Sequence, residues 1–339
     1  MSSFSRRDFI RSAVAVATVG ALGPRLGASP AYGGTTVPFL PYSADSFFKS
    51  TVVGAPIDAT RTAAFRTFMS SFPGQMGTPY PYINGIGASK WGTAYAEGAS
   101  TDPVWKLTGV MSSLCDTLRT QGFHAPEWFG QQLSGTTDSP FTVIDRASGF
   151  TVFGGKAYLA GSYLINVGSA GITYHSSNGL DRRNPATNDK RNFTGRGRLS
   201  DAMAIRRDLV DQGIATNTGL GHALHLFLVA TNASDGFCHP MVGTETRHTD
   251  GWGAEGERLA ISPSVDLTKR GLSPAALVVA RTLQQHGCYI GDNAGTASAL
   301  KAEQTSVTRN PWAGLDFDKK CLAGVSWNDF VVLPKGWQS

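Results

Sequence analysis

The sequence has 339 residues and a formal net charge of +5, and three of these five charges belong to the first 31 residues, where four arginines face one aspartate. The rest of the chain is therefore nearly neutral, which excludes the basic surface typical of a nucleic-acid-binding protein. Its length exceeds that of an average domain, yet all-β proteins often reach about 200 to 250 residues in one unit, so we expect a single large domain.

Residues 1–31 have the features of a twin-arginine export signal. The paired arginines of Ser5-Arg6-Arg7-Asp8-Phe9-Ile10 precede an apolar stretch, Ser12–Leu22, and Ala28-Ser29-Pro30-Ala31 offers small residues for cleavage after Ala31. The stretch is shorter than the about 20 apolar residues that span a membrane. We therefore expect a secreted, extracellular protein that leaves the membrane after signal cleavage.

Residues 32–90 are expected to form an extended N-terminal arm, because Gly33–Gly87 is rich in Pro, Gly and aromatic residues. One helix is predicted in the arm, Thr60–Ser71, with Ala55–Asp58 supplying its cap and first turn. The arm thus carries a single short helix.

Residues 91–339 are predicted to form the main, β-rich domain. The clearest hairpin is Phe141–Phe153, whose turn contains a glycine suited to positive φ. Gly221–Thr231 is continuously apolar, which indicates a strand covered on both faces. Short β-branched or aromatic segments between turns predict further strands at Trp91–Glu97, Thr142–Asp145, Phe150–Phe153, Ala157–Leu159, Tyr163–Val167 and Ser326–Pro334.

Helices are expected at the periphery of this domain. Leu199–Asp211 has a helical pattern, and Ser273–His286 combines a serine cap, a proline in the first turn and Gly287 after its end. Asp181–Arg198 has few apolar residues and is expected to be a long exposed loop. The predicted fold is mainly β, a jelly roll or β-sandwich with two or three peripheral helices.

The four cysteines are Cys115, Cys238, Cys288 and Cys321, an even number that favours disulfides in an oxidising compartment. Three pairings are open, of which Cys238 with Cys288 and Cys115 with Cys321 is the one we expect. No C-x-x-C pair occurs, so a zinc cluster is not predicted, and no metal or other cofactor is expected.

Two groups of motifs resemble a family of secreted, twin-arginine-exported β-rich proteins of actinobacterial type, mostly of unassigned function. The first group is Gly221-His222-Ala223-Leu224, Cys238-His239-Pro240 and His248-Thr249-Asp250-Gly251, and the second is Leu272–Ala276, Leu283–Asp292 and Trp327–Phe330. The likeness spans residues 143–333. It implies a jelly-roll-like body, often associated with carbohydrate degradation, and no particular reaction. His239-Pro240-Met241 departs from the family's apolar-Pro-Ala step, so no role is carried over to His239.

Glycoside hydrolysis would need two carboxylates facing each other across a groove, about 5 Å apart for retention or 6.5 to 9.5 Å for inversion. Candidates lie in the loop-rich middle of the chain. The carboxylates are Asp181, Asp189, Asp201, Glu245, Asp250, Glu255 and Glu257.

Among the histidines, His222 and His225 would point to opposite faces of a strand and cannot share a metal site. We select His222 as a further catalytic candidate, because Gly219 and Gly221 would let a ligand approach it. The alternative is a core histidine that is hydrogen-bonded within the protein.

Substrate-binding candidates are of three kinds. Trp252 offers a flat apolar face for a sugar ring, with a loop anchor as the alternative. The basic residues Arg182, Arg183 and Arg206 would neutralise the acid groups of a charged polymer. In that case Tyr174 or His175 would abstract a proton and the enzyme would be a lyase.

Several enzyme classes are disfavoured, because the sequence has no G-x-S-x-G elbow, no H-E-x-x-H and no phosphate-binding glycine loop. The favoured function is a secreted polysaccharide-active enzyme, foremost a glycoside hydrolase with paired carboxylates. The alternatives are a non-catalytic protein that binds glycans or cell surfaces and a lyase for an acidic polymer. The expected partner is a polysaccharide or a cell-surface glycan.

Overall fold

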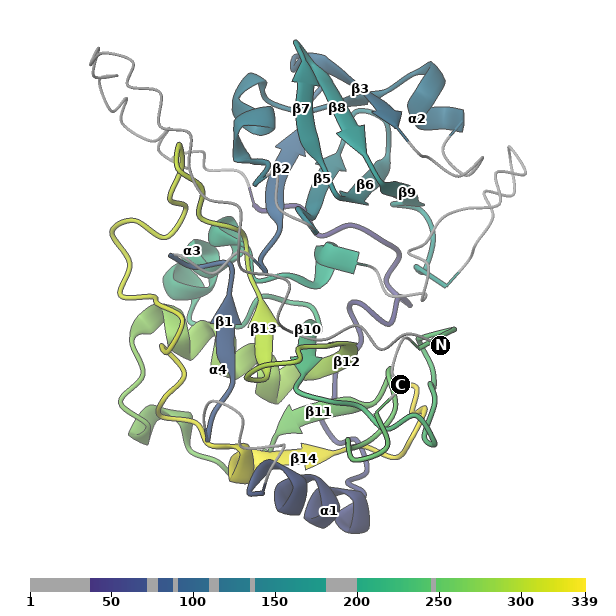
Figure 1. Cartoon of the computed structure of the whole chain (residues 1–339). Helices are drawn as coiled ribbons and strands as arrows, with labels where there is room; N and C mark the ends of the chain where they lie inside the picture. Colours follow the sequence, from purple (N-terminus) through teal and green to yellow (C-terminus); the bar gives the residue numbers. More distant parts are fainter. Residues whose placement is uncertain are drawn as a thin grey trace, which may run out of the picture. The chain divides into compact units, whose positions relative to one another are not determined.

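In the part of the chain that the structure describes, the strands form three separate sheets, one of six strands and two of four (Figure 1). The computed structural model describes residues 37–71, 79–87, 91–109, 116–134, 138–180, 200–244 and 248–339. All of these residues belong to one compact unit.

The six-stranded sheet has the order β1-β13-β10-β12-β11-β14. Its neighbours β10 and β12 run parallel, as do β1 and β13, whereas β11 is antiparallel to both β12 and β14. Helices α1, α3 and α4 contribute to the large hydrophobic core on one of its faces. The bounds are β1 Tyr82–Asn84, β10 Leu224–Leu228, β11 Arg258–Ile261, β12 Cys288–Asn293, β13 Ala299–Lys301, β14 Phe330–Val332, α1 Ala59–Met69, α3 Arg207–Thr216 and α4 Pro274–Gln285.

Helices α4 and α1 begin directly after capping residues that the sequence predicts. The Ser273 hydroxyl accepts a hydrogen bond from the amide of Ala276 at 3.3 Å, and Pro274 opens α4, as predicted. The Asp58 carboxylate caps α1 in the same way. The helix predicted over Leu199–Asp211 was placed too early, because Ile205 pairs with Ala302 in a β-bridge and α3 begins only after it.

The two four-stranded sheets have the orders β2-β5-β6-β9 and β4-β3-β8-β7. Aromatic side chains from both sheets meet in a second core, in which Phe123 of β4 stacks against Phe141 of β5 with ring centroids 6.4 Å apart. The bounds are β2 Ala94–Gly98, β3 Val104–Gly109, β4 Phe123–His124, β5 Phe141–Asp145, β6 Phe150–Gly155, β7 Tyr158–Gly161, β8 Leu164–Val167, β9 Ser169–Tyr174, with α2 Asp116–Thr120 and the 3-10 helices η2 Glu127–Gln132, η3 Ser200–Met203, η4 Leu267–Lys269 and η5 Trp327–Asp329.

The β-rich expectation is met only in part. The predicted hairpin is present as β5 and β6, with Gly149 at φ 74° in its turn. However, the chain is an α/β protein with mixed sheets, whereas a jelly roll is antiparallel. Parallel pairs such as β2 with β5 and β3 with β8 join strands that are far apart in sequence. The described residues do not clearly form a jelly roll, because strand patterns identify strands but not their neighbours.

The expected disulfide between Cys238 and Cys288 is wrong in this structure, since both are free thiols. Cys288 lies at the start of β12 within the large core, whereas Cys238 lies in a loop beside Gly336. Burial raises the pKa of Cys238 to about 11 and that of Cys288 to about 12. Cys321 is also a free thiol, and its expected partner Cys115 lies outside the described residues.

The segment that precedes α1 is extended and crosses several elements. The Ser43 amide donates to the Ser177 carbonyl, the Phe48 carbonyl accepts from the amide of Ala223, and the Val52 amide donates to the carbonyl of Gln285. This segment, residues 37–58, is called the strap below. It connects the end of β9 with the six-stranded sheet.

In the described part of the chain, no helix has the length and apolar character to cross a membrane.

Arg206 is almost completely buried and joins the strap to two other elements. Its guanidinium donates to the Phe39 carbonyl at 2.7 Å and makes a bidentate pair with Asp208 at the start of α3. It also lies 3.6 Å from the Glu97 carboxylate and 5.0 Å from the centre of the Tyr95 ring, both on β2. Burial acts to lower the pKa of Arg206, but the charges of these neighbours outweigh it and the pKa rises.

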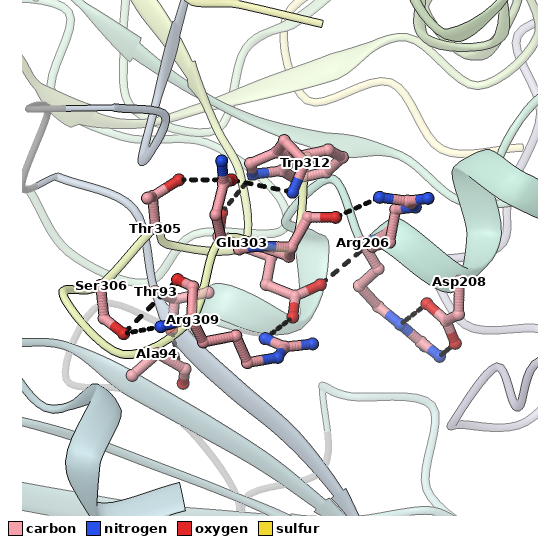
Figure 2. Close-up of polar contacts among 12 residues, drawn as sticks. Thr93, Ala94, Arg206, Asp208, Glu303, Thr305, Ser306, Arg309 and Trp312 are labelled. Atoms are coloured by element: carbon pink, nitrogen blue, oxygen red, sulfur yellow. Dashed lines mark hydrogen bonds and ion pairs between the residues drawn. The ribbon is translucent and has the colours of Figure 1, made fainter. Parts of the chain in front are cut away.

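The buried carboxylate of Glu303 lies close to this network (Figure 2). Glu303 accepts hydrogen bonds from the Arg309 guanidinium and, at 3.1 Å, from the amide of Arg207. Its backbone carbonyl accepts from the Trp312 indole at 2.8 Å. These bonds fix the segment after β13 against the start of α3.

We predict that Arg206→Met lowers the free energy of unfolding by about 3 to 5 kcal/mol, because Asp208 and Glu97 lose their buried counter-charge. The matched control is Arg146→Met, which removes a half-exposed arginine that also pairs with Glu97 and should cost less than about 1 kcal/mol. Urea unfolding of both variants measures the difference. Equal losses would show that Arg206 is not a structural centre.

Candidate functional site

Polar side chains gather where the parallel strands β10 and β12 end. The carboxyl ends of adjacent parallel strands lie at one edge of a sheet, the usual place for a ligand in open α/β folds. There the Asn293 side-chain oxygen accepts from the Thr231 amide at 2.6 Å and from the Thr231 hydroxyl at 3.0 Å. The Asn293 amide nitrogen in turn donates to the Glu255 carboxylate at 3.4 Å. One asparagine thus connects both strand ends to a buried carboxylate.

Asp250 is held at the same edge by its backbone neighbours. The Asn232 side chain donates to the carbonyls of Thr249 and Gly251, both at 3.2 Å. A Cβ atom on Gly251 would lie 2.2 Å from the Thr231 carbonyl oxygen, so only glycine fits. The Asp250 side chain between these contacts is 68% exposed, 3.9 Å from the imidazole of His248. We call Thr231, Asn232, Asp250, Glu255 and Asn293 the Asn293 site.

Glu255 is completely buried, in contrast to Asp250. Its amide donates to the Gly236 carbonyl at 3.2 Å, and its carbonyl accepts from the Cys238 amide at 2.9 Å. These bonds place Phe237 beside Glu255 in a parallel bridge. The Phe237 side chain is 49% exposed. It is therefore an accessible aromatic residue next to the buried carboxylate.

Trp252 is a loop anchor in the structure, which was the alternative to sugar binding. It is 8% exposed and belongs to the large core, where its ring centroid lies 4.9 Å from that of Phe65. The Arg61 guanidinium lies 5.4 Å from the ring centre. Trp252 anchors the loop, and the exposed aromatic residue is Phe237. Phe237 is not predicted from the sequence, since nothing but its glycine neighbour Gly236 marks it as a loop residue.

Glu257 is a buried carboxylate with a complete set of partners. The Arg61 guanidinium binds both of its oxygens, and the Ala254 amide donates to one of them at 2.9 Å. Burial raises the pKa of Glu257, although Ala254 and Arg61 oppose this effect. The contacts connect α1 to the loop before β11, which is a structural role.

His222 lies beneath the strap, not at the Asn293 site. Its imidazole stacks on Phe48 with ring centroids 4.6 Å apart and an interplanar angle of 8°. Its Nδ1 lies 2.9 Å from the carbonyl oxygen of Ala223, and burial lowers its pKa to about 3. This position favours the alternative of a core histidine. His225 lies on β10 against Gly291, where a Cβ atom would come within 2.5 Å of the His225 ring.

The residues considered for a lyase are Tyr174 at the end of β9, His175 directly after it, and Arg206 before α3. The His175 ring is 3.2 Å from the Thr151 hydroxyl and packs on Phe39, and burial lowers its pKa to about 4. Tyr174 packs edge-on against Phe150. Arg206 is engaged by the strap and Asp208, as described above. These three candidates therefore have packing partners within the fold.

Several candidates lie outside the residues that the structure describes. These are Asp181, Arg182, Arg183, Asp189, Glu245 and the side chain of Asp201. In the described part of the chain, no group of three or more His, Cys, Asp or Glu residues is arranged to hold a metal ion.

Comparison with known proteins places the chain in no established group. No protein-family model, curated protein or solved structure matches it. The resemblance to the secreted β-rich family stays a prediction.

We predict that the buried histidines make the protein sensitive to acid. An unfolded histidine titrates near pH 6.5, whereas His175 and His222 keep lowered pKa values in the fold. The unfolded state therefore binds protons first as the pH falls, and the free energy of unfolding decreases from about pH 6.5 toward pH 4.

The variant His222→Phe keeps the ring stacked on Phe48 and removes one titrating group. Between pH 7 and pH 4.5 it should lose about 2 kcal/mol less stability than the unsubstituted protein, as measured by urea unfolding. An identical pH dependence in both proteins would contradict the buried, neutral state of His222.

Proposed function

We propose that the protein is a secreted, polysaccharide-active enzyme, a glycoside hydrolase that uses Asp250 and Glu255. The supporting observation is the Asn293 site itself. It holds two carboxylates of unlike environment on one hydrogen-bonded framework, Glu255 buried and Asp250 exposed. Exposed carboxylates are common, but a fully buried one at the edge of a sheet has a cost that a function would explain.

The two carboxylates suit the two tasks of glycoside hydrolysis. One carboxyl group must give a proton to the leaving oxygen, and the other must stay ionised to activate water or to attack the sugar. Proteins separate these tasks by environment, with the proton donor withdrawn from water. We assign Glu255 as the proton donor and Asp250 as the ionised partner.

Phe237 completes the proposed site on the substrate side. The C–H face of a pyranose ring is apolar and packs on an aromatic plane. Phe237 is adjacent to Glu255 and partly exposed, so a sugar stacked on it would place a glycosidic bond close to that carboxylate. Polysaccharides outside the cell are the expected substrates, in keeping with the predicted export signal.

Non-catalytic glycan binding is the second candidate. The exposed ring of Phe237 supports it as well, because a binding protein needs an aromatic face and hydrogen-bond donors but no carboxylate pair. A lyase has weaker support, since His175 and Tyr174 are packed within the fold.

A panel of neutral and acidic polysaccharides distinguishes the three functions. The protein is incubated with each polymer while reducing ends and absorbance near 235 nm are followed together. New reducing ends without absorbance are expected for the hydrolase, and a rise in absorbance would convert the assignment to a lyase. Binding without either signal would favour the glycan-binding protein.

For the responsive polymer, we predict that Glu255→Gln and Asp250→Asn each lower kcat by about 100-fold or more, the usual contribution of a general acid or base. The matched control is Glu257→Gln, which breaks the pair with Arg61 and should lower the melting temperature without this loss of kcat. A fully active Glu255→Gln variant would rule out the assigned proton donor.

A further inference from the structure

Asn293, the last residue of β12, has a side-chain amide of fixed orientation. Its oxygen accepts from the Thr231 backbone amide at 2.6 Å and from the Thr231 hydroxyl at 3.0 Å. A backbone N–H can only donate, so the oxygen of Asn293 must face Thr231 and its NH₂ group must point away. That NH₂ group donates to Glu255 Oε1 at 3.4 Å. The ends of two parallel strands thus direct one donor at one buried carboxylate.

The backbone beside Glu255 is held to the same strand as Asn293. Ile290, also on β12, accepts a hydrogen bond at 2.7 Å from the amide of Gly256, the residue after Glu255. Gly256 has a φ of 99°, and a Cβ atom there would lie 2.0 Å from the Cys238 carbonyl oxygen, so only glycine fits. The separation of the Asn293 amide from the Glu255 carboxylate is therefore set by β12.

A donor to Glu255 matters most when that side chain is ionised. A hydrogen bond to a charged carboxylate is roughly twice as strong as one between neutral groups. As the proton donor, Glu255 is neutral before the reaction and becomes a carboxylate when its proton leaves. The hydrogen bond from Asn293 therefore strengthens during proton transfer, and an interaction that strengthens on the way to the transition state lowers the barrier.

We propose that Asn293, oriented by Thr231, is a positioning residue for proton donation by Glu255, an inference that rests on the proposed hydrolase function. Because Oε1 accepts from Asn293, it is the carbonyl oxygen of the neutral acid, and the proton is on Oε2. This proton moves to the glycosidic oxygen, whose bond to the anomeric carbon breaks and leaves its electron pair on that oxygen. Asp250 or water supplies the new bond to the anomeric carbon. Asn293 stabilises the negative charge that stays on Glu255.

Kinetics of Asn293→Ala on the responsive polymer provide the first test. We expect kcat to fall about tenfold and KM to change by less than about twofold, because the lost hydrogen bond acts mainly on the charged form. The alkaline limb of the pH dependence of kcat should move to higher pH, since the acid holds its proton more tightly without this donor. If Glu255→Gln is inactive but Asn293→Ala keeps the kcat and alkaline limb of the unsubstituted enzyme, the proposal is overturned and the hydrolase function stands.

The matched control is Asn310→Ala. Asn310 is an exposed asparagine after β13 whose side-chain oxygen accepts from the Trp312 amide at 3.1 Å. This variant should lower the melting temperature without moving the pH profile, as expected for a purely structural role. Thr231→Val removes one of the two bonds that orient Asn293. It should change kcat and the alkaline limb in the same direction as Asn293→Ala, by a smaller amount.

Nuclear magnetic resonance without substrate separates this inference from the proposed function. The NH₂ signals of Asn293 in isotope-labelled protein are assigned by their absence from Asn293→Ala and followed as the pH changes. They should shift as Glu255 ionises, and this shift should be missing in Glu255→Gln. Signals that do not move with pH, or that move alike in both proteins, would overturn the proposal. The expected shift without cleavage of any polymer would confirm the contact and refute the hydrolase function on which the role depends.

Discussion

The buried guanidinium of Arg206 connects parts of the protein that are far apart in sequence. It binds the Phe39 carbonyl in the strap, pairs with Asp208 at the start of α3 and lies beside Tyr95 and Glu97 on β2. A charge removed from water is tolerated only where its partners are in place. The strap, a helix and a strand of one four-stranded sheet must therefore come together for this side chain to be buried.

The strap extends this dependence to the six-stranded sheet. Phe48 stacks on His222, and Ser50 supplies two of the acceptors for Arg258. The strap therefore contributes to the burial of a histidine and of an arginine beside the sheet. The segment has little regular structure of its own, yet it lets polar groups be buried next to the sheet. Its low content of helix and strand reflects its position as a covering layer.

The candidate site illustrates how environment separates residues of the same type. Glu255 and Glu257 are two positions apart and both are buried. Glu257 is bound by Arg61 and the Ala254 amide and holds α1 to the loop, whereas Glu255 meets the amide of Asn293 at the ends of β10 and β12. Both were candidate carboxylates on the basis of the sequence. Their different partners show the structural task of Glu257, which the sequence does not reveal.

The sequence by itself determined the features that depend on neighbouring residues. The serine cap and Pro274 placed α4, the glycine turn placed the β5 and β6 hairpin, and the apolar run over Gly221–Thr231 contained β10. Local signals of this kind act within one or two turns of chain, so they are readable in sequence order. The same signals placed the start of α1 within one residue, at Thr60 where the helix begins at Ala59.

Tertiary structure decided everything that depends on which distant segments meet. It paired β10 with β12 in parallel, turned Trp252 into the core and Phe237 toward water, placed His222 under Phe48 and kept Cys238 apart from Cys288. Strand partners and side-chain surroundings are set by contacts across the whole chain, and the sequence pattern of one strand is compatible with many neighbours. The surroundings of each side chain in the Asn293 site follow from those contacts, because burial and hydrogen-bond partners are properties of the assembled fold.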